Sequence, residues 1–180
     1  MTDRTLLSIA EPETLMAIDL ANEHLLTARA ISNIVDGHHL KHLGLFDIPS
    51  LEAAHFSVSA SSTNQLVSLY LVGDTIDDVV LHQLATGGKL RVLFVDNTDI
   101  SDGAVADALR SNPELAELVI SNCPVSVDTL VKVKKLNALR LLNVSHISAD
   151  SVQIKGLRSD LLLHFPEAQI TLSSAMDQNE

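Results

Sequence analysis

The sequence predicts an α/β repeat fold, in which short parallel strands alternate with helices or turns. An apolar pattern recurs along most of the chain at intervals of 24 to 26 residues. Glycine, proline or asparagine precedes most copies of the pattern, as expected of turns. Between copies, the apolar spacing changes from a period of two to a helical period. A single strand and helix cannot bury an apolar side alone, so the units are expected to stack on a shared core.

Six copies of the pattern predict six strands. Each copy is apolar at its first, fourth and sixth places. Because side chains alternate between the two faces of a strand, the fourth and sixth places are expected in the core. The third, fifth and seventh places are expected on the opposite, outward face. The copies begin at Leu15, Leu40, Leu66, Leu90, Leu115 and Leu139.

The segments between the strands carry helix signals of different strength. Four residues stand where helix N-caps are expected, namely Ser101, Asp102, Ser126 and Ser148. Apolar residues follow the strands at helical positions, namely Leu81, Val105, Leu130 and Val152. Residues 57–64, in contrast, are too polar and too favourable to β-structure for a regular helix.

The whole chain, residues 1–180, is predicted to form one domain with a cap at each end. Leu6, Leu7 and Ile9 predict a short N-terminal helix that covers the first strand. Near the other end, a last helix is expected to stop at Pro166 and to lead into a last short strand. The expected divisions are an N-terminal cap at 1–14, repeats at 15–147, a C-terminal helix and last strand at 148–172, and a polar tail at 173–180.

The repeats resemble those of the leucine-rich repeat family. The family motif L-x-x-L-x-L-x-x-N/C-x-L is matched best by Leu115 to Val125, where Cys123 falls on the Asn/Cys place. The stretch Ile100-Ser101-Asp102-Gly103 is similar to the ribonuclease-inhibitor and F-box subclass. Other residues take the Asn/Cys place elsewhere, namely Asp74, Thr98 and Ile147. An unbroken buried ladder of such residues is therefore not expected.

The resemblance implies a particular architecture and a particular kind of function. It implies a solenoid of six to seven repeats of about 24–26 residues. A curved parallel sheet would form the concave face and short helices the convex face. The resemblance also implies a non-catalytic module that binds another protein through its concave face.

The charge balance narrows the expected partners. Lysine and arginine number 12 and aspartate and glutamate 23, so the formal net charge is −11. Nucleic acid and anionic membranes require clustered basic residues and are not expected as partners, whereas a basic protein would be attracted. An apolar content of 46% excludes a disordered chain, and the single Cys123 excludes a disulfide scaffold. Without a long apolar run or a secretory charge pattern, a cytoplasmic protein is expected.

The outward strand places predict the binding surface. Three of the five aromatic residues fall on them, namely Phe46, Tyr70 and Phe94. Neighbouring strands lie about 4.8 Å apart, so Tyr70, Phe94 and Val119 are expected to touch. Exposed apolar patches with aromatic anchors are typical of protein interfaces. The candidate partner-binding residues are Phe46, Tyr70, Val72, Val92, Phe94, Asp96, Glu117, Val119, Leu141 and Asn143.

The expected function is protein–protein interaction, in one of three versions. An inhibitor or immunity-type protein would neutralise a basic effector enzyme. A homodimerising structural protein would present the same face to a second copy. An adaptor in a larger complex would need a second surface, which Lys132, Lys134 and Lys135 could supply. The alternative to all three is that residues 57–64 or the polar tail cover the apolar face within the monomer.

Candidate catalytic chemistry is weaker, and no enzyme, metal or cofactor is expected. Residues 38–42 contain three histidines but bring no cysteine and no well-spaced carboxylate beside them. Cys123 would need a base such as His146 to act as a nucleophile, but the repeat motif places it in the core. The stretch Gly87-Gly88-Lys89 lacks the upstream glycine and the following serine or threonine of a phosphate loop.

Overall fold

The chain folds into one parallel sheet with helices beside it. The computed structural model describes residues 1–9, 15–37, 39–51, 56–58, 65–147 and 149–175. In this part of the chain, seven parallel strands pair in chain order from β1 to β7. The strands are β1 (Ala17–Ala21), β2 (His42–Phe46), β3 (Ser68–Val72), β4 (Val92–Asp96), β5 (Glu117–Ser121), β6 (Leu141–Ile147) and β7 (Gln169–Ser174). The predicted α/β class and its parallel sheet are confirmed.

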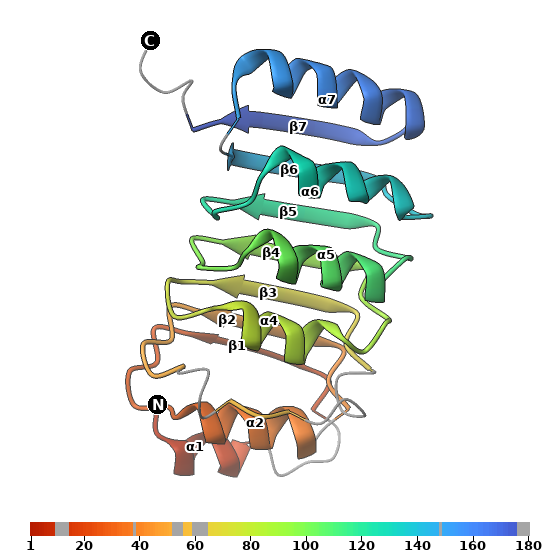
Figure 1. The fold of residues 1–180 in the computed structure, drawn as a ribbon. Coiled ribbons are helices and arrows are strands. Elements are labelled where there is room, and N and C mark those ends of the chain that lie inside the picture. The colour runs from red at the N-terminus through yellow and green to blue at the C-terminus, as the bar shows by residue number, and fades with distance from the viewer. Residues whose placement is uncertain (10–14, 38, 52–55, 59–64, 148, 176–180) are drawn as a thin grey trace.

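The helices lie on one face of the sheet, and those after α1 lie between successive strands in the chain. Figure 1 shows α4, α5, α6 and α7 side by side in front of the strands, with α1 and α2 at the N-terminal end. The described helices are α1 (Asp3–Ile9), α2 (Ala28–Gly37), α4 (Asp78–Ala85), α5 (Asp102–Ser111), α6 (Val127–Leu130), the 3₁₀-helix η2 (Val131–Lys135) and α7 (Ser151–His164). The opposite face of the sheet carries the outward strand places.

The strands pair in the register that the apolar pattern predicts. Leu69 pairs with Leu43 on one side and with Leu93 on the other, and all three are fully or almost fully buried. The sixth-place residues continue in the same way, with Leu71 opposite Leu45 and Val95. Rows of equivalent apolar side chains therefore run through the molecule at right angles to the strands, and they form its core.

Each of the first five strands is followed by a residue in the left-handed backbone conformation, and β6 contains one just before its last residue. These residues are Asn22, Asp47, Gly73, Asn97, Asn122 and His146, with φ of 50–59° for the non-glycine residues and 120° for the glycine. Glycine tolerates this conformation because it has no Cβ, and Asn, Asp and His are the other residues found there most often. The sequence analysis did not predict this column, although its residue types were the signal.

The left-handed residues extend the hydrogen-bond ladder beyond the strands. Each of the first five donates its backbone N–H to the carbonyl at the seventh place of the next strand. The pairs are Asn22 to Phe46, Asp47 to Val72, Gly73 to Asp96, Asn97 to Ser121 and Asn122 to Ser145, with N–O distances of 2.8–3.3 Å. The chain therefore turns away from the sheet without leaving these backbone groups unpaired.

The starts of neighbouring helices are joined through carboxylates. Asp78 in the first turn of α4 accepts hydrogen bonds from the backbone N–H and the hydroxyl of Ser101, both at 2.6 Å. Asp102, one unit later, accepts from the backbone N–H of Ser126 at 2.7 Å. Burial raises the pKa of Asp102, but the bonds from Ser126 and Thr129 and the nearby Lys132 outweigh it, so the pKa lies below 3.8. These carboxylates tie α4 to α5 and α5 to α6.

Two of the four predicted N-caps are confirmed. Ser101 caps α5 and Ser126 caps α6 by position, but neither side chain bonds to its own helix. Asp102 is not an N-cap, because it lies in the first turn of α5. The predicted cap at Ser148 lies outside the described residues, and the N-cap of α7 is Asp150, which forms a capping box with Gln153.

The two ends of the stack follow the predicted outline with some corrections. Helix α1 forms and packs on α2, with Leu6 fully buried. Helix α7 ends just before Pro166, as predicted, but β7 continues to Ser174, beyond the predicted end at residue 172. Val152 was expected on the apolar side of the last helix, but it is 76% exposed because Ile154, Leu157 and Leu161 take that side.

Candidate protein-binding face

The outward places of the central strands are partly exposed, and their neighbours are buried. In β3 and β4 half-buried outward residues alternate strictly with buried inward residues. In β5 the same alternation begins with the exposed Glu117. The helices lie on the opposite face of the sheet (Figure 1), so the strands themselves shape this surface.

A row of rings crosses the centre of this face. Tyr70 and Phe94 are register partners, and their rings stack with centroids 5.7 Å apart and an interplanar angle of 21°. Phe94 is in turn the register partner of Val119 on β5. On the other side, the His42 ring lies 5.2 Å from the Tyr70 ring at a tilt of 47°. The expected Tyr70–Phe94 contact is confirmed, and His42 extends the row to β2.

Gly44 makes room for the ring of Phe46 beside this row. Gly44 is the register partner of Tyr70 and would face outward, yet it is buried. A Cβ atom at this position would collide with the Asp19 carboxylate and with the Phe46 ring. The absence of a side chain therefore lets the Phe46 ring lie across β2. The outward face is covered at this one point by its own side chains.

The apolar strip is defined as Phe46, Tyr70, Val72, Val92, Phe94, Val119 and Leu141. All of its members are half-buried and lie on the outward face. Beyond Leu141 and the exposed Asn143, the face becomes polar, because their register partners on β7 are Gln169 and Thr171. The strip thus occupies the middle of the sheet.

Carboxylates flank the apolar strip on both sides. Asp96 ends β4, two residues after Phe94, and its carboxylate accepts a hydrogen bond from the Asn122 side chain at 2.9 Å. Glu117 stands at the opposite end of the neighbouring strand and is exposed. Near β2, Asp19 pairs with the His42 ring at 2.8 Å and is 61% exposed. The strip is therefore apolar in the centre and acidic at its margins.

All ten residues predicted for the binding surface lie on the outward face. The structure adds three further residues to that surface. His42, Gly44 and Asp19 belong to the same surface through the contacts described above. Their signal was their position in the same outward places of the first two strands. Sequence reasoning missed them because their importance depends on how the Phe46 and Tyr70 side chains lie.

The residues considered for catalysis or for metal and phosphate binding do not form such a site in the described part of the chain. Cys123 is buried, with its sulfur 3.3 Å from the hydroxyl of the buried Thr98 and 3.0 Å from the carbonyl oxygen of Ser121. Gly88 is part of the turn before β4, with φ of 77°. His38 lies outside the described residues. Within the described ranges, no group of three His, Cys, Asp or Glu residues is arranged to hold a metal ion.

Residues 56–58 lie against the helical side of the molecule. The Gln83 side chain on α4 donates to the carbonyl of Phe56 at 2.9 Å and accepts from the backbone N–H of Val58 at 2.8 Å. The Ser32 hydroxyl on α2 accepts from the backbone N–H of Ser57 at 3.1 Å. Residues 57–64 were the alternative cover for the apolar face, and the start of this segment is held by helices α2 and α4 instead. Residues 59–64 and 176–180 lie outside the described residues.

Comparisons with known proteins do not place the chain in a family. No family model matches its sequence, and no curated protein matches it. Among the described residues, none of the helices combines the length and apolar character needed to cross a membrane. The geometry of the outward face therefore carries the functional argument.

Proposed function

We propose that this chain is a leucine-rich repeat solenoid that binds another protein through the outward face of its sheet. On this proposal, six to seven repeats form a curved stack with the sheet on the concave side and the helices on the convex side. Three features support it: the chain-order parallel pairing, the equivalent rows of core leucines, and the buried contact between Thr98 and Cys123 at the Asn/Cys place. The proposed role is non-catalytic.

The observation that carries the proposal is the stacked Tyr70–Phe94 pair on an open face. Large aromatic side chains at the centre of a patch supply most of the binding energy at protein interfaces, about 2 kcal/mol or more each when truncated. Here the stacking already restricts the rings, so less side-chain entropy is lost when a partner covers them. The His42 ring and the Val119 side chain extend the contact surface at the two ends of the pair.

The partner that fits this face is a basic protein with an apolar anchor. The anchor would bury itself on the apolar strip, and basic groups would meet Asp96, Glu117 and Asp19 at its margins. The net charge of −11 would accelerate the encounter with such a partner. The specific version favoured is an inhibitor or immunity-type protein that neutralises a basic effector enzyme by covering its surface.

Affinity capture from the native cell lysate with matched variants tests this function. The double variant Tyr70→Asp, Phe94→Asp removes the centre of the strip. The control variant Gln169→Asp, Thr171→Asp adds the same two charges to exposed places on the same face. A stoichiometric basic protein that both wild type and control retain, and that the strip variant loses, would support the proposal. Equal capture by all three baits would contradict the site.

Self-association or adaptor function is the second candidate, and the last helix favours it. Leu163 is 85% exposed and Val152 76% exposed on α7, which ends the stack of described helices. Exposed apolar side chains at an end of the stack could pack against a second copy or another subunit. Sedimentation velocity over a range of concentrations distinguishes the cases. If the measured mass rises with concentration, and Leu163→Glu abolishes that rise, then α7 and not the apolar strip is the main interface.

A further inference from the structure

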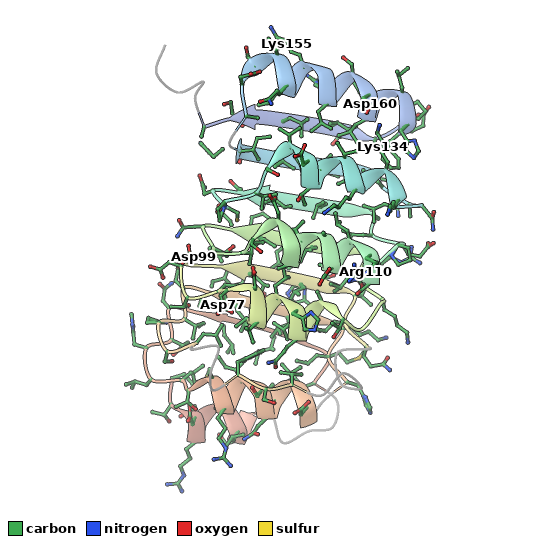
Figure 2. All side chains as sticks on the ribbon, in the orientation of Figure 1. Asp77, Asp99, Arg110, Lys134, Lys155 and Asp160 are labelled. Carbon is green, nitrogen blue, oxygen red and sulfur yellow. The ribbon has the colours of Figure 1, made fainter. Side chains whose placement is uncertain are left out.

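Positively and negatively charged residues gather at opposite edges of the molecule. All eight Lys and Arg residues between positions 41 and 140 lie where helices end or strands begin. This basic edge consists of Lys41, Lys89, Arg91, Arg110, Lys132, Lys134, Lys135 and Arg140. Most of the aspartates lie at the opposite edge, where strands end and helices begin. Figure 2 shows this separation, with Arg110 and Lys134 at one edge and Asp77 and Asp99 at the other.

Helix dipoles explain part of this separation. Carboxylates near helix N-termini and cations near helix C-termini are both stabilising. However, a helix C-terminus carries only about half a unit of negative charge. Three cations gather around one groove beside the end of α5, which is more positive charge than that terminus can balance.

The groove lies between α5 and η2 and has a volume of about 140 Å³. Ala106 and Leu109 form its apolar part, and Arg110, Lys132 and Lys135 surround it. Like charges held close together repel one another, and a bound anion would relieve this repulsion. The groove thus combines a small apolar floor with a positive rim.

The existing interactions of these three cations are weak enough to leave capacity for a ligand. Arg110 is 74% exposed and pairs with Asp107 only three residues earlier on α5, at 2.8 Å. Exposed pairs of this kind are weak, and the guanidinium has further N–H groups to donate. Lys134, in contrast, points to Asp160 on α7 and forms an ion pair there. In the described part of the chain, neither Lys132 nor Lys135 has an ion-pair partner within 4.0 Å, although Lys132 lies near enough to Asp102 to help lower the pKa of that carboxyl.

We propose that the groove lined by Arg110, Lys132 and Lys135 is a second binding site, which takes a short acidic polypeptide segment. Its carboxylates would pair with the three cations, and an apolar side chain would rest on Ala106 and Leu109. A short peptide fits better than nucleic acid, because a continuous polyanion would also meet the overall charge of −11. At about 0.15 M salt this wider repulsion is largely screened beyond about 8 Å, whereas direct pairs persist.

Fluorescence polarisation with a labelled hexaglutamate peptide tests the proposal at physiological salt. The triple variant Arg110→Glu, Lys132→Glu, Lys135→Glu should lose about tenfold in affinity or more, because three exposed ion pairs are reversed. The control triple variant Arg29→Glu, Lys155→Glu, Arg158→Glu has the same net charge but leaves the groove intact, and it should bind nearly as well as wild type. The neutral variant with glutamine at the three groove positions should show a smaller loss in the same direction.

Three results would overturn the proposal. Equal losses in both triple variants would mean that only the overall charge matters. If the wild-type protein at millimolar concentration did not bind hexaglutamate, the groove would not be a site for acidic peptides. Tighter binding of a six-nucleotide single strand than of the peptide would assign the groove to nucleic acid. The proposed function is tested separately, because the Tyr70→Asp, Phe94→Asp variant should bind hexaglutamate as wild type does.

Discussion

The left-handed residue after β4 offers a direct test of the reasoning about the fold. Asn97 has φ of 52°, is exposed, and donates its backbone N–H to Ser121 at 3.0 Å. An alanine Cβ in this conformation costs roughly 1 kcal/mol, whereas asparagine tolerates it. Asn97→Ala should therefore lower the free energy of unfolding by about 1 kcal/mol and the melting temperature by about 2–4 °C.

Two matched variants show whether backbone conformation is the cause. Asn97→Gly removes the same side chain but fits the left-handed region, so its cost should stay below that of alanine, within about 0.5 kcal/mol of wild type. Gly156→Ala adds a Cβ in the middle of α7, which would meet nothing within 4 Å apart from adjacent residues and the backbone of its own helix, and it should raise stability by about 0.5–1 kcal/mol.

Urea denaturation followed by circular dichroism measures all three variants. The reasoning requires Gly156→Ala to have a higher urea midpoint than wild type. It also requires Asn97→Gly to have a higher midpoint than Asn97→Ala. If alanine and glycine at position 97 gave the same midpoint, the left-handed conformation would not be what selects asparagine. Loss of the asparagine side chain itself would then be the explanation.

Three further predictions concern the core, the outward face and the helix junctions. Leu93→Ala should destabilise the protein by about 2–5 kcal/mol in thermal unfolding, because Leu93 is almost fully buried at the centre of the sheet. The matched change Val92→Ala on the outward face should cost less than about 1 kcal/mol. Gly44→Ala should leave the melting temperature within about 3 °C but displace the ring that lies over it, which the ring-proton shifts of Phe46 would reveal by NMR. Asp102→Asn should be less stable than wild type at pH 7. Because the folded pKa of Asp102 lies below 3.8, the difference should shrink as the pH falls below that value, and a difference that persisted unchanged at pH 2 would contradict the role given to this carboxylate.

The strand register could be predicted because it depends on a local rule. Side chains alternate along a strand, so Leu69 and Leu71 had to face the same way wherever the strand lay. The next unit repeated the pattern with Leu93 and Val95, and the structure pairs these residues as expected. Burial of one face determines register strongly, because a shift of one residue would expose every core side chain.

The candidate site could be predicted only in outline. The outward positions of Tyr70 and Phe94 followed from alternation, and their contact followed from the spacing of strands. The position of the Phe46 ring over Gly44 did not, because it depends on the absence of a side chain and on the orientations of neighbouring residues. The acidic margins of the apolar strip and the basic groove between α5 and η2 likewise combine residues from different repeats.

The sequence by itself determined the repeat length, the strands and the set of buried side chains. These features come from short-range periodicity, and the energy of burying leucine outweighs other preferences at those positions. Only the tertiary structure decided which polar groups meet between repeats. Asp78 reaches Ser101 across 23 residues, and Arg110 and Lys132 share one groove, because stacking brings distant units within reach of each other. Such contacts depend on side-chain geometry in three dimensions, which no spacing along the chain specifies.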